Sequence, residues 1–221
     1  LAAQARAIEV IRSRYPDHDV LAEESGQTPG GASDYCWIVD PLDGTTNYSR
    51  GYPCFSVSIG LSYRGEAVLG VVYDPLRDQL FQAQRGHGAY LNDHRIHVSG
   101  VERLINALVG LDWARKQDLR SQTAQAMAEV APEVGSLRSI GSAALGLCSV
   151  AAGWLDAYFH LSLKPWDMAA ASVIIQEAGG TISDLAGHPW HLRSNDCLAS
   201  NGLIHQQRLN MLAKLRLKPT G

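Results

Sequence analysis

Two aspartates near the start of the chain stand three residues apart, in a segment that could hold a metal ion and a phosphate group together. Asp40 and Asp43 flank Pro41, and an apolar run typical of a buried strand precedes them. Carboxylates at a strand end can share a hard cation such as Mg²⁺, which prefers oxygen ligands. Gly44 and Thr45 follow at once and offer backbone N–H groups and a hydroxyl to an anion. This combination is typical of metal-assisted phosphate chemistry.

The proline decides whether the two carboxylates can meet. Along an extended backbone, residues three apart are separated by about 10 Å. Because the ring of Pro41 fixes φ, we predict a turn that brings Asp40 and Asp43 together. In isolation, such a segment is more typical of a surface turn that caps a helix. The metal interpretation therefore depends on further acids joining the pair.

Two other acidic positions are candidates for the same site. Glu23 and Glu24 end a short extended segment, and a nearby cation would relieve the repulsion between them. Asp167 follows Pro165 in the first turn of a predicted helix, where acids are also favoured by the helix dipole. Each position alone has an ordinary structural explanation. All of these acids, however, fall at the ends of predicted elements, where distant segments can converge.

The spacing of apolar residues divides the chain into two parts, residues 1–103 and 104–221. The first part predicts a helix over 2–14, an extended segment over 20–26, a loop over 27–33, strands over 37–39, 55–63, 67–73 and 79–84, a strand and turn over 88–93, and a last strand over 96–98. Neighbouring strands with short turns indicate an antiparallel sheet.

The second part has a different rhythm, in which strands and helices alternate. Strands are predicted over 107–111, 137–140, 155–161, 181–184 and 197–200, and helices over 117–130, 142–153, 166–178 and 203–215. This alternation indicates an α/β half, so the whole chain is predicted to be of the α/β (α+β) class. The interface between the two parts is the expected place for a functional site.

Composition and charge exclude several classes of protein. Of the 221 residues 46% are hydrophobic, the level of a globular protein with a buried core. The formal net charge of −3 argues against nucleic acid as a partner, and no apolar stretch reaches the ~20 residues that cross a bilayer. Four distant cysteines without a C-x-x-C pair favour free thiols in the cytoplasm. Since the sequence begins without Met inside a helical pattern, we expect the natural chain to extend upstream.

Together these segments resemble the inositol monophosphatase family of magnesium-dependent, lithium-sensitive sugar phosphatases. The matching stretches are residues 22–25, 37–47, 141–144, 166–170 and 177–180, and the likeness runs from about Arg12 to the C-terminus. The resemblance implies a layered αβαβα sandwich of the sugar phosphatase type. It implies an antiparallel sheet in the N-terminal half, a mixed sheet in the C-terminal half, and usually a homodimer.

The resemblance also implies a set of metal ligands. Glu23 and Asp40 hold a first Mg²⁺ in the family, with help from the carbonyl group of Leu42. Asp40, Asp43 and Asp167 hold a second ion, and a third, weaker ion can lie near Glu23. Two to three Mg²⁺ ions are therefore expected.

Other motif residues are implied to contact the substrate and the attacking water. Gly44 and Thr45 offer backbone donors to the phosphate, and Glu24 lies with the Thr45 hydroxyl around the water. The positions that match substrate-hydroxyl contacts are Asp43, Gly141, Ser142, Ala143 and Asp167.

Two departures from the family pattern bear on activity and substrate. Family members carry a T-x-x-D segment whose aspartate pairs with the threonine matching Thr45, and nothing before Glu23 supplies it here; a chain truly lacking it should be impaired. Inositol-preferring members often place a glutamate at the position of His160. A neutral histidine accepts at most one hydrogen bond, which weakens the expectation of an inositol preference. A position at a strand end, outside the site, is the alternative for His160.

The sequence therefore predicts a magnesium-dependent phosphomonoesterase that hydrolyses inositol 1-phosphate, or a related small polyol or sugar monophosphate, with a metal-activated water. Histidinol phosphate, fructose 1,6-bisphosphate and 3′-phosphoadenosine 5′-phosphate stay open as substrates. The lack of a basic cluster near the motifs favours a monophosphate. The alternative of another class is a non-catalytic, dimeric regulatory or binding protein on the same scaffold, and the complete set of acids argues against it.

Overall fold

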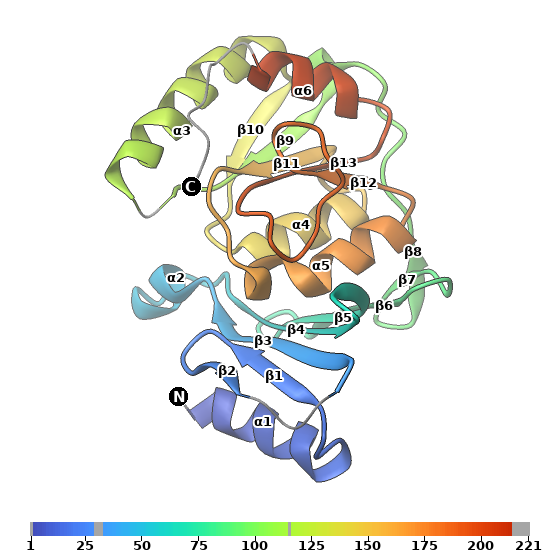
Figure 1. Ribbon diagram of the computed structural model, residues 1–221. Helices are drawn as coiled ribbons and strands as arrows, with labels where there is room; N and C mark the ends of the chain where they lie inside the picture. The colour runs from blue at the N-terminus through green and yellow to red at the C-terminus, as the bar shows by residue number, and fades with distance from the viewer. Residues whose placement is uncertain (1, 29–32, 115, 214–221) are drawn as a thin grey trace.

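Helices and strands stack in five layers in the order α, β, α, β, α (Figure 1). The computed structural model describes residues 2–28, 33–114 and 116–213. The outer layers are α1 (Ala2–Arg14) on one side and α3 (Gln117–Val130) with α6 (His205–Ala213) on the other, and α4 (Ala143–Ala151) and α5 (Pro165–Glu177) form the central layer. The predicted αβαβα sandwich is confirmed.

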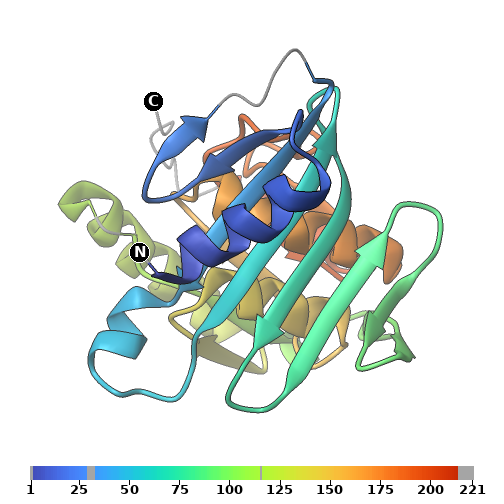
Figure 2. The same ribbon diagram turned by 90° about the horizontal axis from the view of Figure 1, so that it is seen from below.

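The first sheet has eight strands in the order β2-β1-β3-β4-β5-β6-β7-β8. The strands are β1 (Asp19–Ala22), β2 (Gly26–Thr28), β3 (Tyr35–Asp43), β4 (Ser56–Tyr63), β5 (Glu66–Asp74), β6 (Gln79–Gln84), β7 (Ala89–Leu91) and β8 (His94–Ile96). All neighbours run antiparallel except β1 and β3, which are parallel. Buried and half-buried residues alternate strictly along β4, because successive side chains point to opposite faces. Helix α1 crosses the outer face (Figure 2).

Two details of this sheet differ from the sequence prediction. The loop expected over 27–33 begins as strand β2, which pairs with β1 through a tight turn; residues 29–32 lie outside the described residues. The strand expected over 96–98 is β8, which lies two residues earlier. It begins early because the chain already reverses at Asn92 and Asp93, both in the left-handed conformation that hairpin turns require.

The second sheet is mixed, with strand order β10-β9-β11-β13-β12. Its strands are β9 (Leu108–Leu111), β10 (Ser136–Ser139), β11 (Ala157–His160), β12 (Thr181–Ser183) and β13 (Cys197–Ser200). The pairs β9–β10 and β9–β11 are parallel, whereas β13 is antiparallel to both of its neighbours. These elements lie within two residues of the predicted bounds, apart from the end of the last helix, which falls outside the described residues. The boundary between residues 103 and 104 stays a prediction.

Helix α5 is buried on all sides because a sheet lies on each face of its layer. Residues 168–175 are all buried, so this helix shows no amphipathic pattern. Two glycines let it approach the first sheet: a Cβ at Gly60 would lie 3.0 Å from the Cβ of Ala169, and one at Gly70 would lie 2.1 Å from the carbonyl oxygen of Ala170. This contact fixes the height of α5, and with it Asp167, above β3.

The described part of the chain shows no helix with the length and apolarity that a membrane crossing needs. All four cysteines are free thiols, as predicted, and Cys54, Cys148 and Cys197 are buried.

Replacing Gly70 by alanine tests the close contact between β5 and α5. The new Cβ would overlap backbone atoms of Ala170, which cannot move without shifting the helix. We expect Gly70→Ala to lower the free energy of unfolding by about 1–3 kcal/mol, the range for overpacked sites. Urea unfolding measures this loss. Gly100→Ala, where a Cβ meets nothing within 4 Å, should change stability little; equal stability of the two variants would contradict the contact.

Candidate active site

Three carboxylates converge where the first sheet meets the central helices. Asp40 and Asp43 lie at the end of β3, and Asp167 lies in the first turn of α5. Each offers one carboxylate oxygen, and the three atoms lie within 4.8 Å of one another. Asp40 and Asp43 are buried and Asp167 is half-buried.

The two aspartates of β3 meet through a β-bulge rather than through the predicted turn. Asp40 pairs with Ser58 and Asp43 with Ser56, so β3 holds one extra residue between these pairs. Pro41 has no N–H group to give to the ladder, and the N–H of Leu42 turns inward and donates to the Asp40 carboxylate at 2.9 Å. The strand therefore continues to Asp43 while both carboxylates face the same way.

Burial and mutual repulsion perturb both acids. Burial raises the pKa of Asp40 from 3.8 to about 9, and the neighbouring carboxylates of Asp43, Glu23 and Asp167 add to the effect. Burial also raises the pKa of Asp43 to about 6, although hydrogen bonds from the N-terminus of α4 oppose the shift. Without a cation, the site therefore keeps a proton at neutral pH. An all-carboxylate oxygen donor set with unbalanced charge fits a hard divalent ion such as Mg²⁺.

Helix α4 holds Asp43 in place. The backbone N–H groups of Ala143 and Ala144 donate to its carboxylate at 3.3 and 3.0 Å, and the hydroxyl of Ser142 donates to the same group. Since the first N–H groups of a helix have no partner within it, Asp43 satisfies donors that would otherwise need a cap. The half of the molecule that contains the second sheet is thus attached directly to Asp43, a candidate metal ligand.

The residues after Asp43 open the short helix α2 (Thr45–Ser49), which the sequence did not predict. Gly44 has a φ of +91°, and a Cβ there would lie 3.0 Å from the carbonyl oxygen of Cys54, so only glycine fits without strain. The Thr45 hydroxyl donates to the carbonyl oxygen of Leu42 at 3.1 Å. Gly44 and Thr45 both face the pocket.

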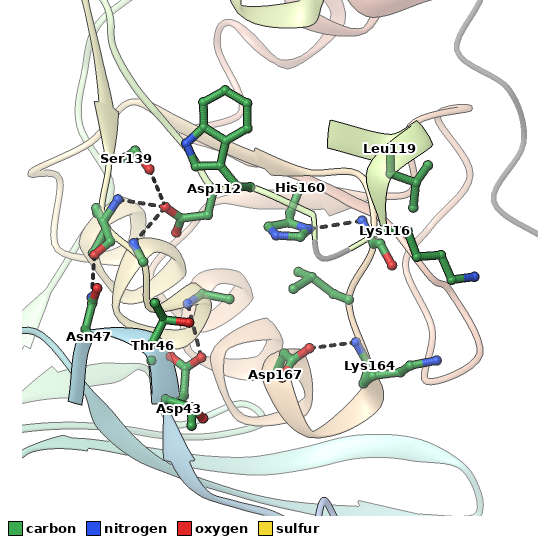
Figure 3. Close-up of a pocket in the computed structure, with 18 of the residues that line it drawn as sticks. Asp43, Thr46, Asn47, Asp112, Lys116, Leu119, Ser139, His160, Lys164 and Asp167 are labelled. Atoms are coloured by element: carbon green, nitrogen blue, oxygen red, sulfur yellow. Dashed lines mark hydrogen bonds between the residues drawn. The ribbon is translucent and has the colours of Figure 1, made fainter. Parts of the chain in front are cut away.

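A cavity of about 820 Å³ opens beside these acids, between the two halves of the chain (Figure 3). The residues named from the sequence that line it are Glu23, Asp43, Gly44, Thr45, Gly141, Ala143, His160 and Asp167. Asp40 and Leu42 are not among the lining residues, although an Asp40 oxygen lies within 4.8 Å of oxygens of Asp43 and Asp167. Ser142 is buried with its hydroxyl against Asp43, and Glu24 is exposed, with its backbone N–H donating to the side chain of Gln4 at 3.1 Å. The roles given to these residues stay predictions.

His160 lies on the pocket wall and is almost fully buried, at 6% exposure. Its Nδ1 accepts a hydrogen bond from the backbone N–H of Ser162 at 3.0 Å. Burial lowers the pKa of His160 to about 4, so the ring is neutral at pH 7. Because Nδ1 is the acceptor in this bond, the ring proton is on Nε2, and His160 can only donate to a ligand through that atom.

Among the other residues that line the cavity are Asp112, Lys116 and Lys164, which have charged side chains. Asp112 is buried, and Lys116 and Lys164 are exposed. The sequence showed no basic cluster near the motifs, but the fold brings two lysines to one pocket, Lys116 from the N-terminus of α3 and Lys164 from the N-terminus of α5. Asp112 and Lys116 carry no local pattern that marks them. Lys164 stands three residues before Asp167, and from the sequence it is a candidate contact for an anionic substrate, with a solvated lysine as the alternative.

The five layers and the acidic cluster at the β3–α5 junction are the architecture of the sugar phosphatase type. The chain belongs to the inositol monophosphatase family, whose family model matches residues 1–217.

The relatives of this chain carry two kinds of name. The Nus factor SuhB of Pasteurella multocida is 42% identical over 96% of this chain and 79% of its own length. The extragenic suppressor protein suhB of Bartonella henselae superposes with a TM-score of 0.92 at 37% identity, covering 96% of this chain and 82% of that one. SaIMPase-II, the Staphylococcus aureus inositol monophosphatase-II, has been solved bound to inositol monophosphate; it superposes with a TM-score of 0.84 at 34% identity, covering 95% and 81%.

The raised pKa of Asp40 predicts how stability depends on pH without metal. The folded state binds this proton more tightly than the unfolded chain between about pH 4 and pH 9, so the free energy of unfolding falls as pH rises through that window. Excess Mg²⁺ should therefore raise Tm by several degrees more at about pH 8 than at about pH 5, since ~1 kcal/mol moves Tm by ~2–4 °C in a protein of this size. Thermal unfolding with a chelator and with Mg²⁺ measures the difference.

The matched variant for this experiment is Asp40→Asn, which cannot ionise. Its Tm should depend less on pH and respond less to Mg²⁺ than that of the unmodified protein. The same pH slope in both proteins would show that Asp40 is not the titrating group.

Proposed function

We propose that this protein is a magnesium-dependent phosphomonoesterase that hydrolyses a small polyol or sugar monophosphate. The observation that carries the proposal is the convergence of the Asp40, Asp43 and Asp167 carboxylate oxygens within 4.8 Å, beside a cavity large enough for such an ester. Membership of the inositol monophosphatase family supports the same activity.

Each of the acids has a part in this proposal. Asp40, Asp43 and Asp167 would hold one Mg²⁺ ion. Glu23, Asp40 and the carbonyl group of Leu42 would hold another, and two to three ions would bind in all. The chemistry that Mg²⁺ supplies when bound is charge neutralisation on the ester and a lowered pKa for a water molecule.

The chain's own polar groups would orient the two reactants. Gly44 and Thr45 stand at the start of α2, where their backbone N–H groups would donate to phosphate oxygens. Thr45 and Glu24 would orient the attacking water. Gly141, Ser142 and Ala143, with Asp43, Asp167 and His160, would contact the remainder of the substrate.

The lining around the three aspartates bears on which ester is bound. His160 offers only a donor, and Lys116 and Lys164 add positive charge, so acceptor-rich groups are favoured there over hydroxyl donors. Inositol 1-phosphate stays a candidate because SaIMPase-II, a relative, has been solved with inositol monophosphate. Fructose 1,6-bisphosphate and 3′-phosphoadenosine 5′-phosphate gain weight from the two lysines, since each carries a second phosphate, whereas histidinol phosphate carries a cationic amine and stays open without that support.

A second candidate function is that of a Nus factor, favoured by the name of the Pasteurella multocida relative. Such a role would need a macromolecular partner. Nucleic-acid machinery would then be a candidate partner, although the net charge of the chain argues against nucleic acid. Both functions are compatible with a cytoplasmic homodimer and with lithium sensitivity of any phosphatase activity. The release of phosphate separates them.

Asp40→Asn tests the proposed activity. The amide cannot supply a second anionic oxygen to a cation, so we expect phosphate release from a panel of esters to fall at least about a hundred-fold, with the fold retained. Released phosphate and circular dichroism measure the two effects. Asp93→Asn is the matched control, since Asp93 is exposed in a left-handed turn that asparagine also adopts. Near-normal turnover by Asp40→Asn in excess Mg²⁺ would refute the assignment.

His160→Glu tests the substrate preference. A carboxylate replaces a donor with an acceptor for substrate hydroxyls, so we expect the ratio of kcat/KM for inositol 1-phosphate to that for fructose 1,6-bisphosphate to rise about ten-fold or more. The exposed His94→Glu change adds the same charge away from the pocket and should leave the ratio unchanged. An unchanged ratio in His160→Glu would place His160 outside the substrate contacts.

A further inference from the structure

Asp112 is a buried acid on the wall of the pocket with no part in the proposed chemistry. It follows the end of β9, and its exposure is only 6%. Asp112 does not belong to the group of carboxylates that could share a metal ion. A buried carboxylate is unfavourable unless hydrogen bonds compensate it, so its partners indicate what it does.

Four donors surround the two oxygens of this carboxylate. Figure 3 shows the Ser139 hydroxyl among them. One oxygen accepts the Ser139 hydroxyl at 2.9 Å and the backbone N–H groups of Ile140 and Gly141 at 2.8 and 2.7 Å. The other accepts the hydroxyl of the buried Tyr158 at 2.9 Å. Each carboxylate oxygen has two lone pairs, so three donors on one oxygen and one on the other leave at most one acceptor site open. Asp112 is therefore committed mainly to holding these four donors.

Asp112 and Asp43 bind the same segment, residues 139–144. Its first half donates to Asp112, and its second half donates to Asp43 through Ala143 and Ala144. Two carboxylates, one from each sheet, thus hold the segment by its backbone N–H groups.

Asn47 fixes the same segment from the carbonyl side. Its side-chain amide donates to the carbonyl oxygen of Ile140 at 3.0 Å and to that of Cys54 at 2.8 Å. Gly141 has a φ of +78°, and a Cβ there would lie 2.7 Å from the Asn47 amide nitrogen. Donors and acceptors of the segment are therefore paired on both sides, and Ile140 and Gly141 present a fixed surface to the cavity.

We propose that Asp112 is a positioning residue that fixes Ile140 and Gly141 as the surface against which the polyol or sugar part of the substrate binds. The inference rests on the proposed phosphatase function. Misplacing a binding surface by about 1 Å can reduce turnover of the correctly held substrate up to ~100-fold. Because Asp43 holds the second half of the segment independently, the loss of Asp112 should affect the polyol more than the metal site.

The test compares Asp112→Ala on two esters with excess Mg²⁺. For inositol 1-phosphate we expect KM to rise about ten-fold, whereas kcat/KM for p-nitrophenyl phosphate, which has no hydroxyls, should stay within about two-fold. The Mg²⁺ concentration for half-maximal activity should also stay within about two-fold, since Asp43 keeps its partners.

Asp112→Asn serves as the conservative variant. Its amide oxygen can accept the two backbone N–H groups while its amide nitrogen donates to Tyr158, so KM should return to within about three-fold of the unmodified value. Tyr158→Phe removes only the fourth donor and keeps the ring. It should raise KM for inositol 1-phosphate by about two- to five-fold, and it tests the proposal should Asp112→Ala fail to fold.

The outcomes separate the inference from the proposed function. If the unmodified protein hydrolyses either ester while Asp112→Ala and Tyr158→Phe lose activity equally on both, or lose none, the positioning role is overturned and the phosphatase function stands. If Asp112→Asn is as impaired as Asp112→Ala, charge rather than geometry is responsible, which also overturns the inference. Release of phosphate from neither ester by the unmodified protein would overturn both.

Discussion

Repulsion between buried carboxylates is the constraint on which this structure depends. Asp40, Asp43 and Asp167 bring three acidic oxygens within 4.8 Å, and burial removes the water that would screen them. The raised pKa of Asp40 shows the consequence, because its charged form is unfavourable until a proton or a cation compensates it. The surrounding fold must therefore hold these groups together against a force that separates them.

The holding elements are rigid and come from both halves of the chain. The bulge in β3 orients Asp40 and Asp43, and the glycine contacts beneath α5 fix the height of Asp167. Helix α4 contributes backbone donors to Asp43 from the opposite half. Ligands on packed strands and helices keep their geometry better than ligands on loops, so the site is pre-organised for a cation. Because these ligands lie between the two halves of the chain, the cavity beside them also opens between the halves.

Local pattern predicted the α/β class, most elements and the acidic residues, which fall at the ends of predicted elements, and the family resemblance predicted the layered sandwich. Three features required the folded chain. Helix α2 has five residues, too few for a period to show, and the bulge at Pro41 depends on pairing with β4. Asp112 meets Ile140 and Gly141 only because β9 pairs with β10 in the second sheet, and Lys116, which follows β9, lines the same pocket. The buried hydrogen bond between Asp112 and Tyr158 joins residues more than forty positions apart, and no spacing pattern in the sequence connects them.

The distribution of charge in the cavity bears on the two candidate functions. Acids gather at the β3–α5 junction, where the backbone N–H of Lys164 donates to Asp167 at 2.7 Å, while Lys116 lines the pocket from the start of α3. A phosphate ester bound with its phosphate at a cation-filled acidic end would direct its other polar groups to the rest of this lining. For a protein that only assembled with other macromolecules, the same buried acids would reduce stability without contributing to binding. A cation at this site would relieve the repulsion in either case, so even a Nus-factor role would retain a dependence of folding stability on divalent metal.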